Sequence, residues 1–474
     1  MLWSFSDSMS TQVVQFVVGI VLARILSPAE FGLIGMITVF LAVTQSLVDS
    51  GFGQALIRKQ DADDADFSTV FYFNLAAGAL FFALFFLFAP AIARFYSQPE
   101  LTDISRALGI IILINATSIT QRTRLARKVN FRQLMKINLT AAIISGTVAI
   151  IMALSGFGVW SLVWRSIIGS VIQAVLLWYS NKWIPRLIFS KKSFRSLFSF
   201  GSRLLVSGLI DTIYRNIYLL IIGKFFSAAE LGYYTRADQF SRLASQNLTG
   251  TVQRVSYPVL SMVQDDNERL KAGYKKLILS TMFITFIIML GMAAVARPMI
   301  ITLIGTKWLP SVGYLQLLCI GAMLFPLHAL NLNILNVKGR SDLFLKLEVI
   351  KKALAVPVIL AGVFLGITAM LIGMIILSFV AYFINSYYSG RLVSYPVREQ
   401  IADVLPSFIL ALAVSSVVFS MTLFLNIHPA VLLLIQLTVI IILTVFLSRV
   451  FRLKAYMEIK SIIIERIPKL KVVL

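Results

Sequence analysis

The stretch Arg24-Ile25-Leu26-Ser27-Pro28-Ala29-Glu30-Phe31-Gly32 decides the fold, because a similar stretch recurs 200 residues later. The second copy reads Lys224-Phe225-Phe226-Ser227-Ala228-Ala229-Glu230-Leu231-Gly232, and four of its nine positions are identical to those of the first. Each copy joins one long apolar segment to the next. The same local pattern at a fixed offset is typical of an internal repeat, so we predict that the chain consists of two similar halves.

The composition is that of a polytopic membrane protein. Of the 474 residues, 58% are hydrophobic and only 14% are charged, whereas soluble domains contain about 25% charged residues. The mean hydropathy is +0.87. The single cysteine excludes an intramolecular disulfide framework, and two histidines are too few for a histidine-rich metal site. We therefore expect no cofactor and no bound metal.

The net charge of +22 is spread over many short loops. Most Lys and Arg residues lie near the loops after even-numbered apolar segments and in the C-terminal tail. The loops after the odd-numbered segments hold Arg24, Arg94, Arg106, Lys224, Arg297 and Lys307. This bias follows the positive-inside rule and predicts that both termini are cytoplasmic, with no nucleic-acid partner. No signal-peptide cleavage site follows the first apolar segment, so we expect it to remain as a membrane helix.

A bilayer core about 30 Å thick requires roughly 20 apolar residues per helix. The chain contains fourteen such segments, which predicts an all-α polytopic membrane protein with about 14 transmembrane helices. The predicted spans are residues 4–26, 30–52, 68–93, 104–121, 133–155, 157–181, 197–223, 230–258, 274–303, 311–336, 341–365, 367–390, 400–425 and 429–450. We expect Pro326 and Pro357 to kink the helices that contain them.

The repeat aligns the first span with the seventh, and an even number of spans separates them. Both halves therefore enter the membrane in the same direction. This predicts two six-helix lobes related by a pseudo-two-fold axis along the membrane normal, with the substrate path between them. The predicted domains are an N-lobe (1–184), a basic cytoplasmic linker (185–196), a C-lobe (197–393), two extra helices (394–452) and a basic amphipathic cytoplasmic tail (453–474).

Polar residues form stripes along the seventh and eighth spans, where ionisable groups at membrane depth are costly and point to function. The seventh span carries a polar residue at every fourth position: Arg203, Ser207, Asp211 and Arg215. The eighth carries a stripe at alternating intervals of four and three: Thr235, Gln239, Arg242, Gln246, Thr249 and Gln253. The sequence therefore predicts a water-filled cavity. The alternative is that Asp211/Arg215 and Asp238/Arg242 are structural ion pairs.

A cavity rich in arginine suits an anionic substrate, because guanidinium binds phosphate oxygens in a bidentate fork. The first half contributes fewer polar residues, namely Gln45 and Asp49 on the second span and Arg165 on the sixth. The candidate substrate-binding residues are Arg203, Arg215, Arg236, Arg242, Gln239, Gln246, Gln45 and Arg165. The candidate ion-coupling residues are Asp211, Asp238 and Asp49, since a desolvated carboxylate beside a mobile ligand can exchange a proton.

Several motifs resemble one family of exporters. They are Ala23 to Gly32, Gly51-Phe52-Gly53-Gln54-Ala55-Leu56-Ile57-Arg58-Lys59, Phe67-Ser68-Thr69-Val70-Phe71-Tyr72-Phe73-Asn74 and Leu231-Gly232-Tyr233-Tyr234. With the predicted architecture, they resemble the Wzx-type polysaccharide flippases of the multidrug/oligosaccharidyl-lipid/polysaccharide (MOP) exporter superfamily, near the colanic acid and exopolysaccharide exporters. The resemblance covers the first twelve spans.

The resemblance implies a transporter and not an enzyme. Such flippases move an undecaprenyl-pyrophosphate-linked oligosaccharide from the cytoplasmic to the outer leaflet of the bacterial inner membrane by alternating access. A proton or sodium gradient would drive this step in exopolysaccharide, capsule or lipopolysaccharide O-antigen synthesis. The implied partners are the lipid-linked oligosaccharide, membrane lipids, a polysaccharide polymerase and a chain-length regulator.

Three alternatives remain. A multidrug or other amphiphile antiporter has the same fold but favours an acidic or aromatic cavity. A membrane-bound polysaccharide polymerase or acyltransferase needs catalytic groups on large loops, whereas the loops here are short and no nucleophile-base set is evident. A structural scaffold would not need the two polar stripes.

Overall fold

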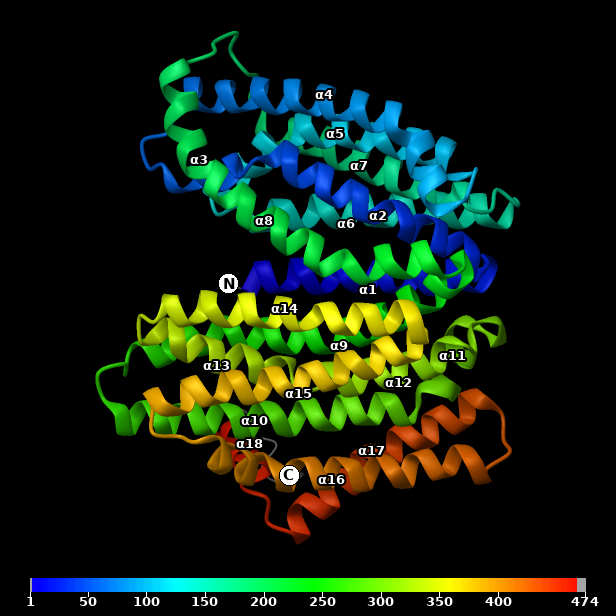
Figure 1. Cartoon of the computed structure of the whole chain (residues 1–474), viewed down its shortest axis with the longest axis vertical. Helices are drawn as coiled ribbons and strands as arrows, with labels where there is room; N and C mark the ends of the chain where they lie inside the picture. Colours follow the sequence, from blue (N-terminus) through cyan, green and yellow to red (C-terminus); the bar gives the residue numbers. More distant parts are fainter. Residues whose placement is uncertain (1, 467–474) are drawn as a thin grey trace. The chain divides into compact units, whose positions relative to one another are not determined.

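The computed structural model describes the backbone of residues 2–466 and the side chains of residues 10–254 and 256–460. The backbone is almost entirely α-helical, and these residues include no β-strand (Figure 1). The predicted all-α class is confirmed. The chain divides into two compact units, with the boundary in the sequence between Thr235 and Arg236.

The first unit contains eight helices and the first residues of a ninth. They are α1 (Leu2–Ile25), α2 (Pro28–Asp49), α3 (Phe52–Arg58), α4 (Asp64–Tyr96), α5 (Leu101–Arg127), α6 (Phe131–Leu154), α7 (Trp160–Asn181), α8 (Lys191–Phe225) and the start of α9 (Ala228–Ser261). Within this unit α1 packs on α6, α4 on α5, and α8 on α2. Because α8 packs on α2, this unit extends past residue 184. The predicted N-lobe (1–184) and C-lobe (197–393) remain predictions.

The second unit contains the rest of α9 and the remaining helices. They are α10 (Asn267–Ala294), α11 (Ala296–Ile304), the 3-10 helix η1 (Thr306–Trp308), α12 (Ser311–Ala322), α13 (Phe325–Val337), α14 (Ser341–Leu365), α15 (Ile367–Leu392), α16 (Val397–Phe424), α17 (Pro429–Val450) and α18 (Lys454–Arg466). In this unit α10 packs on α16, α14 on α15, and α16 on α17. The predicted helix in the tail is present as α18, and residues 467–474 of that tail lie outside the described residues. Tyr456 of α18 is buried and packs on Phe283 of α10.

Each of the fourteen predicted spans coincides with a helix, or with two consecutive helices, in the structure. In the described residues, eleven segments are long and apolar enough to cross a membrane. The three predicted spans that fall short are α1, α9 and α14. The side chains of α1 are described from Ser10 onward, and the apolar helix Ser10–Ile25 is shorter than a full span, while α9 and α14 carry charged residues along part of their length. The most polar helices therefore include α9, on which the second polar stripe lies.

Two predicted spans are interrupted. Residues 274–303 form α10 and α11, which meet at Val295, and residues 311–336 form α12 and α13. Pro326 lies in the first turn of α13, where a missing backbone N–H costs nothing, so this proline begins a new helix. Pro357 lies inside α14, which continues through it.

The repeated stretch begins a helix in both copies. Ser27 caps α2: the Glu30 backbone N–H donates to Ser27 Oγ at 3.4 Å, and Ser27 N donates to Glu30 Oε2 at 2.6 Å. In the second copy, Glu230 N donates to Ser227 Oγ at 3.1 Å at the start of α9. A serine followed three residues later by glutamate is a helix-start signature. This explains two of the four positions that the copies share.

Candidate functional site

The polar stripe of α8 is exposed within the first unit. Arg215 Nε lies 2.7 Å from Asp211 Oδ2, and the two side chains are 65% and 51% exposed. Arg203, two turns before Asp211 on α8, is also exposed. The predicted i,i+4 ion pair is therefore present, and it is not buried inside its own unit.

The fully buried residues of α8 lie near its two ends. They are Leu197, Gly201, Ile222 and Gly223. Gly201 lies against the backbone of the turn after α2, and Gly223 lies against Met36 and Tyr96. Residues 202–221 between these two contacts are half-buried or exposed. The middle of α8, with its charged pair, is thus less enclosed than the two ends.

A charged pair in this position needs water. At 1.5 Å per residue, Asp211 lies roughly 20 Å from the C-terminal end of α8 and about 30 Å from its N-terminal end, so it falls within the thickness of a bilayer core. Hydrocarbon cannot satisfy an ion pair, and lipid-facing charges cost several kcal/mol. An exposed pair on a membrane-length helix is therefore expected to face an aqueous cavity.

The second stripe begins the second unit. Arg242 Nε lies 2.6 Å from Asp238 Oδ2, with side-chain exposures of 39% and 18%. Gln246, one turn later, is exposed. This pair is more enclosed than the pair on α8, because the Asp238 carboxylate is mostly covered. The Arg242 side chain is 39% exposed.

Arg236 has different surroundings from Arg242. Its side chain donates from Nη1 to Gln239 Oε1 at 2.5 Å, and its guanidinium carbon lies 6.0 Å from the centre of the buried Trp308 ring. The residue is only 9% exposed. Gln239 is half-buried and serves as the acceptor of this contact. The structure therefore brings two candidate binding residues together as one packed polar group at the start of the second unit.

The candidate residues of the first half lie on two helices, with Gln45 and Asp49 one turn apart on α2 and Arg165 on α7. Gln45 Oε1 accepts a hydrogen bond of 3.0 Å from Asn115 Nδ2 on α5. Asp49 lies at the end of α2, near the backbone N–H of Gly53. Arg165 is half-buried on α7. The sequence prediction missed Asn115, although an amide at membrane depth on a neighbouring span was a usable signal.

A second polar network was also missed. Tyr274 Oη on α10 donates to Asn331 Oδ1 on α13 at 2.8 Å, and Ser389 Oγ on α15 donates to the same oxygen. These side chains are buried, and their mutual hydrogen bonds replace those lost from water. Asparagine and serine inside these apolar runs form no periodic pattern, so nothing in their spacing groups them. The network joins three helices of the second unit.

One end of the first unit contains a cluster centred on Asp64. The Asp64 carboxylate lies 3.3 Å from Arg124 Nη1 and 3.6 Å from Arg186 Nη2, and it accepts a hydrogen bond of 3.2 Å from Trp183 Nε1. The Arg124 guanidinium lies over the rings of Phe67 and Trp183, at 5.0 and 4.7 Å. The cluster fastens the α7–α8 connection to α4 and α5.

An adjacent ion pair closes the loop before α4. Lys59 Nζ lies 2.7 Å from Asp66 Oδ2, and this hydrogen bond raises the pKa of Lys59 above its ordinary value. Asp66 N donates to Asp63 Oδ1 at 2.8 Å, which caps α4. These carboxylates are engaged in capping and ion pairing, so the loop has a structural role.

Comparison with known proteins places this chain in a family. Residues 21–313 match the family described as polysaccharide biosynthesis protein. The chain is 28% identical over 343 residues to the teichuronic acid biosynthesis protein TuaB of Bacillus subtilis, a match that covers 72% of this chain and 71% of TuaB. It is 25% identical to the lipopolysaccharide biosynthesis protein WzxC of Escherichia coli, over 72% of this chain and 70% of WzxC. It is 26% identical to the succinoglycan biosynthesis transport protein ExoT of Rhizobium meliloti, over 65% of this chain and 62% of ExoT.

The fold resembles that of solved membrane transporters. The lipid II flippase MurJ, in an inward closed conformation, superposes with a TM-score of 0.77 at 15% identity, over 95% of this chain and 99% of MurJ. An inward-facing multidrug resistance transporter of the MATE family superposes with a TM-score of 0.61 at 15% identity, over 81% of this chain and 96% of that chain. Identity this low supports only the fold. The chain belongs to the polysaccharide biosynthesis protein family, and it has the fold of the MOP-superfamily transporters.

Proposed function

We propose that this protein is a flippase that moves an undecaprenyl-pyrophosphate-linked oligosaccharide from the cytoplasmic to the outer leaflet of a bacterial inner membrane. The observation that carries the proposal is the exposed Asp211–Arg215 pair in the middle of α8, where no residue is fully buried. Membership of the polysaccharide biosynthesis family and the transporter fold support the same class of substrate.

In this mechanism, arginines bind the charged part of the substrate. The guanidinium of Arg215 and that of Arg242 each suit the pyrophosphate, because a planar guanidinium can donate two parallel hydrogen bonds to phosphate oxygens. Arg203 adds positive charge on the same stripe as Arg215. Gln246 donates to and accepts from sugar hydroxyls. The lipid tail stays in the bilayer while the carrier alternates between an inward-open and an outward-open state.

Arg165 and Gln45 bind the substrate from the first half of the chain. Arg236 and Gln239 support the second stripe through their mutual hydrogen bond. The ion gradient, of protons or sodium, acts through Asp211, Asp238 or Asp49. A carboxylate whose neighbouring arginine is drawn to the substrate loses part of its counter-charge, which favours uptake of a cation. A polysaccharide polymerase and a chain-length regulator then act on the delivered repeat units.

A transport assay in vesicles tests the proposal. The purified protein is reconstituted, and fluorescent lipid-linked repeat units are added to one leaflet. We expect protein-dependent transfer to the other leaflet, measured by the fraction of label that a membrane-impermeant quencher reaches. Failure to move this substrate, together with uptake of a cationic dye, would contradict the proposal and favour an amphiphile antiporter.

A further inference from the structure

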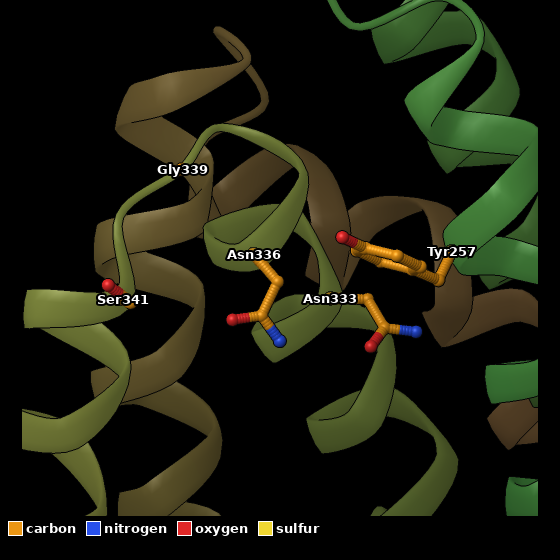
Figure 2. A pocket seen from close by; sticks show the side chains of 5 residues that line it. All are labelled: Tyr257, Asn333, Asn336, Gly339 and Ser341. Carbon is orange, nitrogen blue, oxygen red and sulfur yellow. The ribbon is translucent and has the colours of Figure 1, made fainter. Parts of the chain in front are cut away.

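A small pocket lies where α9, α13 and α14 meet in the second unit (Figure 2). Its volume is about 380 Å³, and its lining residues are Tyr257, Asn333, Asn336, Gly339 and Ser341. We call it the amide pocket. None of the described residues that line it carries a charged side chain. Figure 2 shows the Tyr257 ring extending from α9 toward the two asparagines of α13. The pocket therefore combines an aromatic ring with neutral polar groups.

The walls of the amide pocket are fixed by hydrogen bonds. Asn333 is only 9% exposed, and its Nδ2 donates to Ser256 Oγ at 2.8 Å, which joins α13 to α9. Gly339 has a φ of 69°, a left-handed conformation that glycine adopts without strain. The Gly339 backbone N–H donates to the Asn336 carbonyl at 3.0 Å, and Arg340 N donates to the Leu335 carbonyl at 2.8 Å. The turn at Gly339 and the side-chain amide of Asn333 are thus held in place before any ligand binds.

Other polar groups of the pocket remain accessible to a ligand. Asn336 and Ser341 are exposed, and Tyr257 is 46% exposed. Asn336 offers two N–H donors and a carbonyl acceptor, and Ser341 offers a hydroxyl that can donate and accept. Asn333 and Asn336 are three residues apart on α13, so they share one face of the helix.

Charged side chains near the pocket are engaged elsewhere. Lys338 Nζ donates to the Gln264 carbonyl at 2.6 Å and to Asn267 Oδ1 at 2.8 Å. Arg340 Nη2 pairs with Asp342 Oδ2 at 2.7 Å. An anionic ligand such as a phosphate therefore finds no charge complement in the pocket lining. A neutral ligand with several hydroxyl groups fits this chemistry better.

We propose that the amide pocket binds a neutral sugar ring of the transported oligosaccharide, an inference that rests on the proposed function. The Tyr257 ring packs on the apolar face of the sugar, while the amides and Ser341 bind its hydroxyls. Tyr257 lies fifteen residues after Arg242 on α9, which is about 22 Å at 1.5 Å per residue. With the pyrophosphate at Arg242, the pocket holds a sugar distal to the pyrophosphate. The loop at 338–340 belongs to the end that the charge bias assigns to the cytoplasm, so binding precedes transport.

A comparison of two substrates tests this inference. One is the complete lipid-linked repeat unit, and the other is truncated to the sugar attached to the pyrophosphate. Tyr257→Leu and Asn336→Ala should each slow transport of the complete unit by about two- to tenfold, as expected for the loss of a few neutral contacts. Both variants should move the truncated substrate at the wild-type rate. Tyr257→Phe, which keeps the ring, should slow transport of the complete unit less than Tyr257→Leu does.

Matched controls lie outside the pocket. Tyr387 on α15 is exposed to the same 46% as Tyr257, and Asn426 is an exposed asparagine between α16 and α17. Tyr387→Leu and Asn426→Ala should transport both substrates normally. Equal losses on both substrates, or normal transport of the complete unit by the pocket variants, would overturn the inference. If the wild-type protein moves neither substrate, the proposed function itself fails, and the inference fails with it.

A binding measurement gives an independent readout. Cys319 is buried, so a cysteine introduced by Ser341→Cys, which leaves Tyr257 and both asparagines in place, should dominate the reaction with a maleimide. The probe is the repeat-unit oligosaccharide released from its lipid and pyrophosphate. We expect this sugar to slow alkylation at position 341 and to leave alkylation of an Asn426→Cys variant unchanged. Equal alkylation of position 341 with and without the sugar would contradict the assignment.

Discussion

Gly32 packs directly against the backbone of Ala228, at the place where the two copies of the repeat meet. A methyl group on Gly32 would lie 1.7 Å from the Ala228 carbonyl oxygen. The contact is reciprocal: a methyl group on Gly232 would lie 1.9 Å from the carbonyl oxygen of Pro28. Pro28 and Ala228 occupy equivalent positions of the repeat, as do Gly32 and Gly232. Reciprocal contacts between equivalent positions are what a two-fold relationship produces.

The first prediction concerns these two glycines. Gly32→Ala and Gly232→Ala should each destabilise the protein by about 1–3 kcal/mol, because a backbone oxygen cannot move aside as a side chain can. The measurement is the thermal unfolding midpoint in detergent. Gly313→Ala is the matched control, since an added methyl there meets no atom within 4 Å. If all three variants unfold at the same temperature, the close approach is not a constraint on the fold.

The sequence predicted the elements of the fold better than their contacts. Hydrophobic length and turn residues located fourteen helical spans, and the Ser-x-x-Glu pattern marked the starts of α2 and α9, because these signals are local. The interruption at Val295 was missed, although Pro298, whose nitrogen cannot donate to the Ala294 carbonyl, lies in the first turn of α11 and was a usable signal. Of the two prolines expected to kink their helices, Pro326 instead begins α13.

In the candidate site, too, local features were predicted and contacts between helices were not. Both i,i+4 ion pairs followed from spacing alone and are present. The residues that contact Gln45 and Arg236 could not be predicted from spacing. Asn115 lies 70 residues from Gln45, and Trp308 lies 72 residues from Arg236, so packing between helices decides these contacts. The amide pocket likewise depends on helices that are far apart in sequence.

The second prediction tests the arginines of the two stripes. Arg215→Ala and Arg242→Ala should be inserted and folded but should abolish polysaccharide export, because each removes a guanidinium proposed to bind the pyrophosphate. Arg215→Lys and Arg242→Lys should restore export only in part, since lysine offers a point charge in place of a planar fork. Export is measured as surface polysaccharide in cells with matched expression. Wild-type export by both alanine variants would remove the cavity mechanism.

The third prediction concerns Asp64. Asp64→Asn should lower the stability of the first unit by about 1–2 kcal/mol, because hydrogen bonds to a charged group are lost while the side chain is still partly exposed. Thermal unfolding in detergent measures the change. Asp61→Asn, an exposed neighbour in the same loop, should have little effect. A larger effect at Asp61 than at Asp64 would show that the cluster does not hold the α7–α8 connection.

The fourth prediction concerns topology. Val129, which is 69% exposed between α5 and α6, should be cytoplasmic, and Leu309 should be on the outside. In intact cells, an impermeant maleimide should label Leu309→Cys and leave Val129→Cys unlabelled, because the loop near Val129 is the richest in arginine and lysine. The buried Cys319 supplies a low background. The reverse labelling pattern would invert the orientation.

The last prediction separates neutralisation from coupling at Asp211. If Asp211 only neutralises Arg215, then Asp211→Asn leaves an uncompensated positive charge, and removing that charge as well should restore transport. If Asp211 carries the coupling ion, then Asp211→Asn should block transport, and adding Arg215→Gln should not rescue it. We expect the second outcome for Asp211, because its pair is exposed in the middle of α8, where no residue is fully buried.

The same pair of substitutions at Asp238 and Arg242 supplies the comparison. The Asp238 carboxylate is only 18% exposed and is held by Arg242 at 2.6 Å, so we expect neutralisation there and rescue by the double change. The readout is flipping of the lipid-linked oligosaccharide in vesicles over a range of pH, analysed as a double-mutant cycle. Coupling through a proton at Asp211 predicts that Asp211→Asn also removes the pH dependence of the residual rate. Full recovery in the Asp211→Asn, Arg215→Gln double variant, with an unchanged pH profile, would reject the coupling role because only a pairing role is reversed by removing both charges.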